Sequence, residues 1–446
     1  MNEQSLTKHY EQTVIVLLNT CHKMTIIGIL LLFFFILTFH RITKSSPLKK
    51  YFFPALLFKM ICGLLVGWVY TYYYQGGDTF ALFKDGIVLH QVLKESIPQY
   101  LDFLLHSTED YPESILLQLS NRNERAVFMA KWISLVNILT NNNYWVTACY
   151  FSLFSFWGCW VLSTQLYKQF PTLRSGIVVS FLFYPSVTFW SSGIMKESIL
   201  LGAIGLCTAI VILLLREFKG IKSFSLLLGV GGLLWVIFRL KYYYFAIYFP
   251  CLLILVTSYL FIIRWKYPPL RVFIMSCVLL LTVIGAMTVS HPNLQIERVL
   301  EVIYLNYEKL SGTVHQSILI PDLRPTLRSF ISHVPQAITE GLFRPYLWEK
   351  NTLLQTLQSI ENSLLLLLSM TSIYFFRSWK VQKKALPFLW AVLPYIALLI
   401  PLLAFASPNL GTLSRYKVGY LSFLLLLIIS GIPAFHKNNS HPLNNK

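Results

Sequence analysis

Apolar stretches long enough to cross a lipid bilayer recur along most of this sequence. An α-helix needs about 20 apolar residues to span the hydrocarbon core. About eleven stretches qualify, at residues 24–39, 54–74, 144–166, 176–190, 198–215, 224–238, 245–263, 272–290, 361–376, 386–406 and 418–434. Only 13% of the residues are charged whereas 55% are hydrophobic, a ratio that a water-soluble protein could not bury in its core. We therefore predict an all-α polytopic membrane protein.

Two of the intervening segments are too long to be simple connectors. They cover residues 75–143 and 291–360, and we expect both to be loops on the extracytoplasmic side of one integral membrane domain that covers residues 1–446. In 80–93 and 97–105, apolar residues recur at helical spacing among charged ones. This pattern predicts amphipathic helices that lie along the membrane surface.

The basic residues indicate how the chain is oriented. If the loop after the first stretch is cytoplasmic, the loops on its side contain almost all of the net charge of +18 and only one acid, Glu217. Lysine and arginine concentrate in cytoplasmic loops of membrane proteins. The charge therefore predicts a multi-pass protein of the plasma (inner) membrane, with its N-terminus outside and its C-terminus cytoplasmic, and it gives no reason to expect nucleic acid as a partner.

Metal-binding patterns are absent from the sequence. The seven cysteines lie in or beside apolar stretches without a Cys-x-x-Cys pair, and the histidines show no metal-ligand spacing. We expect neither a metal nor another cofactor, and we interpret the cysteines as buried apolar residues.

Asp78 is the first polar residue of interest. It follows Gly76 and Gly77 at the predicted outer end of the second stretch, directly after an aromatic run. Two glycines let the backbone turn and approach a ligand, and a carboxylate there could act as a general base. The alternative is that Asp78 caps a helix that begins near Thr79.

Two further outer turns carry cations. Lys196 and Glu197 end a Ser-Ser-Gly-Ile-Met-Lys-Glu turn between the fourth and fifth stretches, which is either an interfacial ion pair or an anion-binding helix start. Arg239 and Lys241 end the sixth stretch on the same predicted side. Because positive charge outside opposes the usual bias, we interpret it as a requirement for binding phosphate.

The remaining candidates lie near the last three stretches. Arg344, Trp348 and Glu349 precede the ninth stretch, where they form either an amphipathic membrane anchor or part of a binding cleft. Arg415 and Lys417 precede the last stretch, after a turn at Gly411. All of these candidates fall on one predicted face, which is a stronger indication of a site than any one of them.

The Asp78 region resembles the GT-C membrane glycosyltransferases, which carry an acidic residue early in a long first outer loop. The resemblance covers the overall organisation and this region of the chain. It implies a donor sugar on a polyprenyl phosphate, a glycan or lipid acceptor, Asp78 as base and basic residues that hold the phosphate. The family usually places this loop after the first span, and its frequent second carboxylate is not adjacent here, since the next acid is Asp85.

Other functions remain open. The arginine-bearing outer loops, with Arg344 and Arg415, are similar to those of membrane polysaccharide polymerases and ligases that act on lipid-diphosphate glycans. A transporter or lipid-linked glycan flippase is a further alternative. Transporters usually show charges in mid-membrane or paired broken helices, and Lys59 is the only clear charge in the middle of a stretch. Our leading hypothesis is sugar transfer on the outer side, with Asp78 as base and Arg344, Arg415 and Lys196 stabilising the leaving phosphate.

Overall fold

A computed structural model describes residues 25–218, 220–290, 295–311, 317–349, 352–376 and 381–435. Within these ranges the regular structure is helical, apart from one isolated bridge between Ser317 and Asn409. Cys21 and the C-terminal residues 436–446 lie outside the described residues. The helices and their length confirm an all-α membrane protein.

Eight described helices are long and apolar enough to cross a membrane. They are Thr25–Thr43, Lys49–Tyr73, Tyr144–Gln169, Lys196–Arg216, Gly220–Leu240, Tyr242–Arg264, Pro269–Ala286 and Lys383–Ala406. A ninth would be the bent pair Leu410–Tyr416 and Val418–Ser430. The predicted stretch 176–190 is divided among short helices, and 361–376 lies in a helix outside this group. The multi-pass character is shown, and the count of eleven spans stays a prediction.

The chain divides into two compact units, each described here by itself. Unit 1 comprises Met1–Trp157 and Ser191–Ile199, and unit 2 comprises Gly158–Trp190 and Leu200–Lys446. Two of the three divisions fall inside helices, α7 (Tyr144–Gln169) and α10 (Lys196–Arg216), and the third directly follows α9 (Pro185–Trp190).

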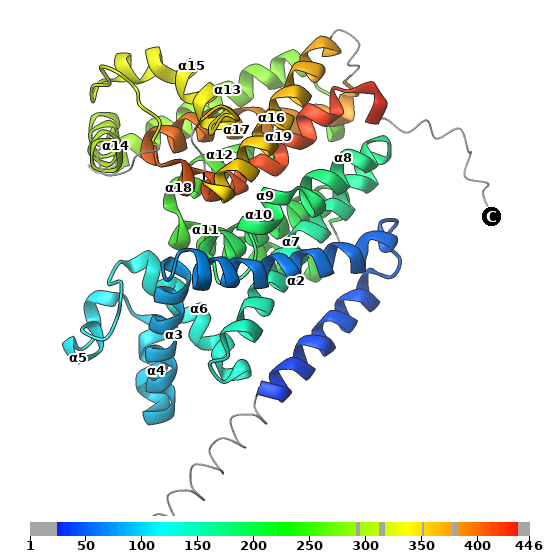
Figure 1. The fold of residues 1–446 in the computed structure, drawn as a ribbon. Helices are drawn as coiled ribbons and strands as arrows, with labels where there is room; N and C mark the ends of the chain where they lie inside the picture. The colour runs from blue at the N-terminus through cyan, green and yellow to red at the C-terminus, as the bar shows by residue number, and fades with distance from the viewer. Residues whose placement is uncertain are drawn as a thin grey trace, which may run out of the picture. The chain divides into compact units, whose positions relative to one another are not determined.

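Unit 1 contains two kinds of helix. Besides Thr25–Thr43, its apolar helices are α2 (Phe52–Trp68), which continues into the π-helical turn η2 (Val69–Tyr73), and the first half of α7. The segment between η2 and α7 forms α3 (Asp78–Glu95), α4 (Ile97–Leu105), η3 (Thr108–Asp110), α5 (Glu113–Leu116) and α6 (Glu124–Thr140). Figure 1 shows α3 and α4 running across the direction of α2.

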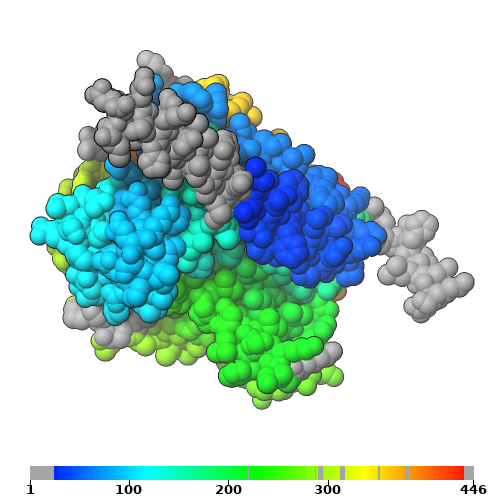
Figure 2. All heavy atoms as spheres, turned by 90° about the horizontal axis from the view of Figure 1, so that it is seen from below, coloured from blue at the N-terminus to red at the C-terminus, as the bar shows by residue number. Residues whose placement is uncertain are grey.

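The α3–α6 segment has a hydrophobic core of its own. Side chains of α3, α4 and α6 meet there, and the buried members are Val88, Leu89, Val92, Tyr100, Phe103, Tyr111, Leu119, Val127 and Ala130. Gly86 lets α3 approach α6, since a Cβ there would lie 2.4 Å from Ile133 Cγ2. The cyan atoms of this segment form one compact mass in Figure 2. The predicted amphipathic helices therefore exist, and one face of each packs on protein.

Unit 2 holds the remaining helices. They are α8 (Arg174–Val178), α9 (Pro185–Trp190), α11 (Gly220–Leu240), α12 (Tyr242–Tyr259), α13 (Pro269–Ser290), α14 (Ile296–Ser311), α15 (Leu327–Phe343), α16 (Leu353–Tyr374), α17 (Leu386–Ala406), α18 (Leu410–Tyr416) and α19 (Val418–Ser430), besides parts of α7 and α10. Helix α17 packs on α12 and α15, and α19 packs on α16 and α9. α18 and α19 meet at an angle of 67°.

Candidate functional site

Asp78 lies at the first position of α3, and its side chain is exposed. The backbone before it turns through Gly76 and Gly77, whose φ angles are +142° and +117°. L-residues with a side chain rarely adopt these angles, so the glycines are needed for the turn. Gly77 is the N-cap of α3 and no side chain caps the helix there. The helix thus begins one residue earlier than predicted, and Asp78 lies in its first turn and not at the N-cap position.

Thr79 connects the start of α3 to the 191–197 turn within unit 1. Its buried hydroxyl donates to the carbonyl oxygen of Ile194 at 3.0 Å, and it lies 2.8 Å from the hydroxyl of Tyr144. Because the threonine proton is used on Ile194, the Tyr144 hydroxyl donates to Thr79 Oγ1. Two of the polar segments predicted to share a face are thus joined by a direct hydrogen bond.

The 191–197 turn is buried and held at several points. Ser191 and Ser192 have no exposed surface. The amide of Gly193 donates to Ser152 Oγ at 2.9 Å, and its carbonyl accepts from Ser198 Oγ at 2.8 Å. Gly193 has a φ of +69°, so this position also favours glycine.

The charged end of this turn begins α10. Lys196 is its first residue and is partly exposed, whereas Glu197 is only 5% exposed. Since Thr79 bonds to Ile194 two residues earlier, Lys196 and Asp78 flank the same junction. Unit 1 therefore joins the start of α3, which carries Asp78, to the turn that carries Lys196 and Glu197.

Arg344 lies in a network of charges in unit 2. Its guanidinium donates to both carboxylate oxygens of Glu349, at 2.8 and 3.2 Å, and to Glu340 at 3.2 Å. A third partner is the carbonyl of Ser317, at 3.1 Å. Burial alone would lower the pKa of Arg344, but the paired carboxylates of Glu349 and Glu340 outweigh burial and raise the pKa above its ordinary value.

Lys417 lies at the bend between α18 and α19 and is 1% exposed. Its ammonium donates to the carbonyl of Leu342 at 3.0 Å and to that of Arg344 at 3.4 Å. The amide of Asn362 donates to the same Arg344 carbonyl at 2.8 Å. Carbonyls at the end of α15 would otherwise lack partners, so Lys417 caps this helix.

Lys241 is a further buried cation of unit 2, and it contacts Tyr416. The ammonium of Lys241, which is 3% exposed, lies 3.5 Å from the centre of the Tyr416 ring, a close cation–π contact. The Tyr244 hydroxyl donates to the Tyr416 carbonyl. Arg415 and Lys417 are the chain neighbours of Tyr416, and Arg239 lies in the last turn of α11, two residues before Lys241.

Trp348 differs from these buried side chains. It is 79% exposed and stacks on Tyr346, with ring centres 4.8 Å apart. This exposure fits the membrane-anchor interpretation of the 342–350 segment better than that of a cleft wall. Of the three charged residues in that segment, Arg344 and Glu349 bind each other.

Several residues of these clusters were not anticipated. Thr79, Tyr144 and Ser152 organise the unit 1 site, and Glu340 and Asn362 organise the Arg344 network. Thr79 could have been noticed as the neighbour of Asp78. The others have no local signal, because they reach the site only through long-range packing.

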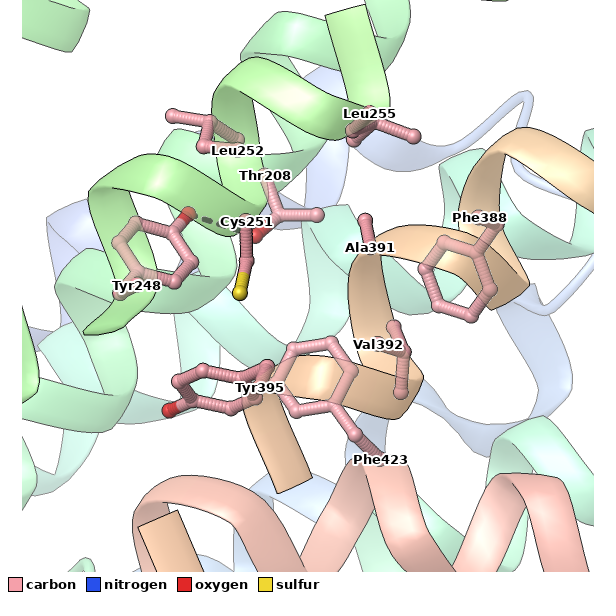
Figure 3. Close-up of a pocket in the computed structure, with 10 residues that line it drawn as sticks. All are labelled: Thr208, Tyr248, Cys251, Leu252, Leu255, Phe388, Ala391, Val392, Tyr395 and Phe423. Carbon is pink, nitrogen blue, oxygen red and sulfur yellow. Dashed lines mark hydrogen bonds between the residues drawn. The ribbon is translucent and has the colours of Figure 1, made fainter. Parts of the chain in front are cut away.

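A small cavity in unit 2 is separate from these residues. It has a volume of about 30 Å³. Figure 3 shows its lining residues: Thr208, Tyr248, Cys251, Leu252, Leu255, Phe388, Ala391, Val392, Tyr395 and Phe423. One water needs about 10–15 Å³, so the cavity is far too small for a sugar. None of the predicted site residues lines it.

Among the described residues, no group of three or more His, Cys, Asp or Glu side chains is arranged to hold a metal ion. The helices define the class, a multi-pass α-helical membrane protein. Comparison with protein-family models, with curated proteins and with solved structures gave no significant match.

Proposed function

We propose that the protein is a membrane glycosyltransferase that moves a sugar from a polyprenyl-phosphate donor to a lipid-linked or surface glycan acceptor. The observation that supports this most directly is the Thr79–Ile194 hydrogen bond, which joins the helix start that carries the exposed Asp78 to the turn that carries the partly exposed Lys196. A base and a cation are the two groups that such a transfer requires. Both belong to unit 1.

The reaction needs one bond to form and one to break. The acceptor hydroxyl attacks the anomeric carbon of the donor sugar and gives its proton to the Asp78 carboxylate. The bond between that carbon and the phosphate oxygen breaks, and the electron pair leaves with polyprenyl phosphate. Lys196 stabilises the negative charge that develops on the leaving phosphate.

The proposal includes the orientation derived from charge. The 75–143 segment and the 191–197 turn face the extracytoplasmic side of the plasma membrane, in a chain with eleven spans, its N-terminus outside and its C-terminus cytoplasmic. Lipid-linked donors and growing surface glycans meet on that side.

The test is sugar transfer by the purified full chain in lipid vesicles. A panel of synthetic polyprenyl-phosphate hexoses and pentoses is supplied with acceptor glycans, and release of polyprenyl phosphate is followed by mass spectrometry. Asp78→Asn keeps the shape of the side chain and should lower kcat by about 100-fold or more, within the range typical of a general base. Asp102→Asn is the control, since this carboxylate of α4 is exposed and paired with His106.

Full activity of a correctly inserted Asp78→Asn variant would rule out the base. Movement of the donor across the vesicle membrane without release of polyprenyl phosphate would favour a transporter instead.

A polysaccharide polymerase or ligase is the second candidate. Its support is the partly exposed Arg415 of unit 2, next to the Tyr416 ring that Lys241 contacts, because a guanidinium suits the binding of a diphosphate. Arg344 supports it less, because Glu340 and Glu349 already neutralise that guanidinium. Loss of chain lengthening in Arg415→Ala, together with a silent Asp78→Asn, would favour this candidate.

A further inference from the structure

Lys59 is a buried cation within an apolar helix. It lies in the span Lys49–Tyr73 and is 4% exposed. Placing an ammonium inside a membrane span is costly, and such residues usually serve a function. The groups that the Lys59 ammonium binds therefore indicate what this residue does.

Its partner is the first residue of the turn described above. The Lys59 ammonium donates to Ser191 Oγ, 132 residues away in the sequence. Both residues belong to unit 1, and Ser191 has no exposed surface. The contact joins the middle of α2 to the turn that carries Lys196.

The backbone of α2 also packs directly on this turn. Gly63 lies one helical turn after Lys59, so both occupy the same face of α2. A Cβ at Gly63 would lie 2.2 Å from Ser152 Oγ and 3.1 Å from the amide nitrogen of Gly193. A Cβ at Gly193 would lie 3.0 Å from the Gly63 carbonyl oxygen. Glycine at both positions therefore allows α2 and the 191–197 turn to approach closely, beside the hydrogen bond between Lys59 and Ser191.

Three different helices thus hold three nearby positions of the turn. Lys59 of α2 binds Ser191, Ser152 of α7 binds Gly193, and Thr79 of α3 binds Ile194. The Thr79 contact stands next to Asp78. A turn fixed at 191, 193 and 194 presents Lys196 in a defined position relative to the start of α3.

We propose that Lys59 is a positioning residue, which fixes the 191–197 turn so that Lys196 faces the donor phosphate while Asp78 accepts the proton. This inference rests on the proposed function. If Lys59 served packing alone, an apolar side chain of similar length would replace it without loss, because exchanging a buried charge for an apolar group is often neutral or stabilising.

The experiment compares Lys59→Met, Lys59→Arg and Leu56→Met in the full chain. Methionine removes the charge and keeps much of the volume, and arginine restores a donor. Leu56 is a buried residue one turn earlier on α2, so its substitution by methionine is a matched control for packing. Ser191→Ala removes the acceptor of the same contact and provides a second test if Lys59→Met fails to fold.

Two measurements are made on each variant. Hydrogen exchange reports on the amides of residues 191–198, and steady-state transfer gives kcat and KM for the polyprenyl-phosphate sugar. In Lys59→Met we expect faster exchange in this segment and a kcat lower by about 10- to 100-fold, with KM changed by less than about twofold, since misplacement of a reacting group lowers the rate more than binding. Ser191→Ala should act in the same direction. Lys59→Arg should restore part of kcat, and Leu56→Met should match the wild type.

The outcomes separate this inference from the proposed function. Wild-type kcat and exchange in Lys59→Met and Ser191→Ala would overturn the positioning role, even where Asp78→Asn abolishes transfer. An equal loss in Leu56→Met would also overturn it, because that loss would reflect packing. Faster exchange in Lys59→Met in a protein whose transfer does not depend on Asp78 would leave Lys59 as the residue that fixes the turn and would remove the glycosyltransferase proposal.

Discussion

Two carboxyl groups on α3 have very different surroundings. Asp78 is exposed, whereas Asp85, two helical turns later, has no exposed surface. Asp85 accepts hydrogen bonds from the backbone amides of Ser120 at 2.6 Å and Asn121 at 3.3 Å. Burial raises the pKa of Asp85, and these hydrogen bonds oppose the rise. Asp85 thus fixes the loop before α6, and of these two acids only Asp78 has an exposed side chain.

His90 makes the stability of the α3–α6 segment depend on pH. It is 5% exposed, its Nδ1 lies 2.7 Å from Asn142 Oδ1, and burial lowers its pKa below the ordinary value of 6.5. Between the lowered pKa and 6.5 the unfolded chain binds more protons than the folded one, so stability rises with pH in this window. The contribution of His90 to the free energy of unfolding is complete above about pH 6.5. It is lost as the pH falls through the pKa that His90 has in the folded protein.

Thermal unfolding in detergent micelles checks this prediction. The wild type should unfold at a lower temperature at pH 5 than at pH 7.5, and His90→Gln should reduce that difference. His106→Gln is the control, because the side chain of His106 is 56% exposed. An equal pH dependence in wild type and His90→Gln would contradict the prediction.

At the scale of helices, glycines determine where α7 and α10 meet in unit 2. A Cβ at Gly158 would lie 2.2 Å from the carbonyl oxygen of Gly202 and 2.6 Å from its Cα. These are backbone atoms, which cannot rotate away. Contacts of this kind stabilise helix pairs in lipid, where small residues let backbones approach closely.

Gly158→Ala should therefore destabilise the protein by about 1–3 kcal/mol, the range expected for an overpacked interior. Gly231→Ala of α11 is the matched control, because nothing lies within 4 Å of a Cβ at that position. There the better helix propensity of alanine should leave stability unchanged or raise it by up to about 1 kcal/mol. Thermal unfolding in the same detergent compares both variants, and equal effects would refute the role of the contact.

Helix breaks were harder to foresee than helices. Eight of the predicted apolar stretches correspond to helices that could span a membrane, because length and hydropathy are properties of the sequence itself. The bend at Lys417 and the short helix α9 depend on partners far away. Lys417 binds the end of α15, and the amide and hydroxyl of Ser186 donate to Glu361 of α16, the hydroxyl at 2.6 Å. Residue spacing does not encode such contacts.

The same limit applies to the candidate site. The glycines at 76 and 77, the exposed Asp78 and the 191–197 turn could be selected from the sequence because turn residues and charges interrupt apolar stretches there. Their connection through Thr79 could not be predicted, since Thr79 and Ile194 are 115 residues apart.

For the whole molecule, the distribution of charge predicts which segments face which side. Ser107 lies in the predicted outer segment, and Thr172 lies in a predicted cytoplasmic loop. In a cysteine-free background, Ser107→Cys should react with a membrane-impermeant maleimide in intact cells, whereas Thr172→Cys should react only after the membrane is opened. The reverse pattern would invert the orientation and would place Asp78 on the cytoplasmic side.

The contact between Lys59 and Ser191 has a consequence for biosynthesis. Ser191 is made 132 residues after Lys59. At about 5–20 residues per second, a ribosome needs roughly 7–26 seconds to add them. Until Ser191 has been added, the Lys59 ammonium lacks this hydroxyl partner. The insertion apparatus, or another part of the nascent chain, must shelter this charge until the turn emerges.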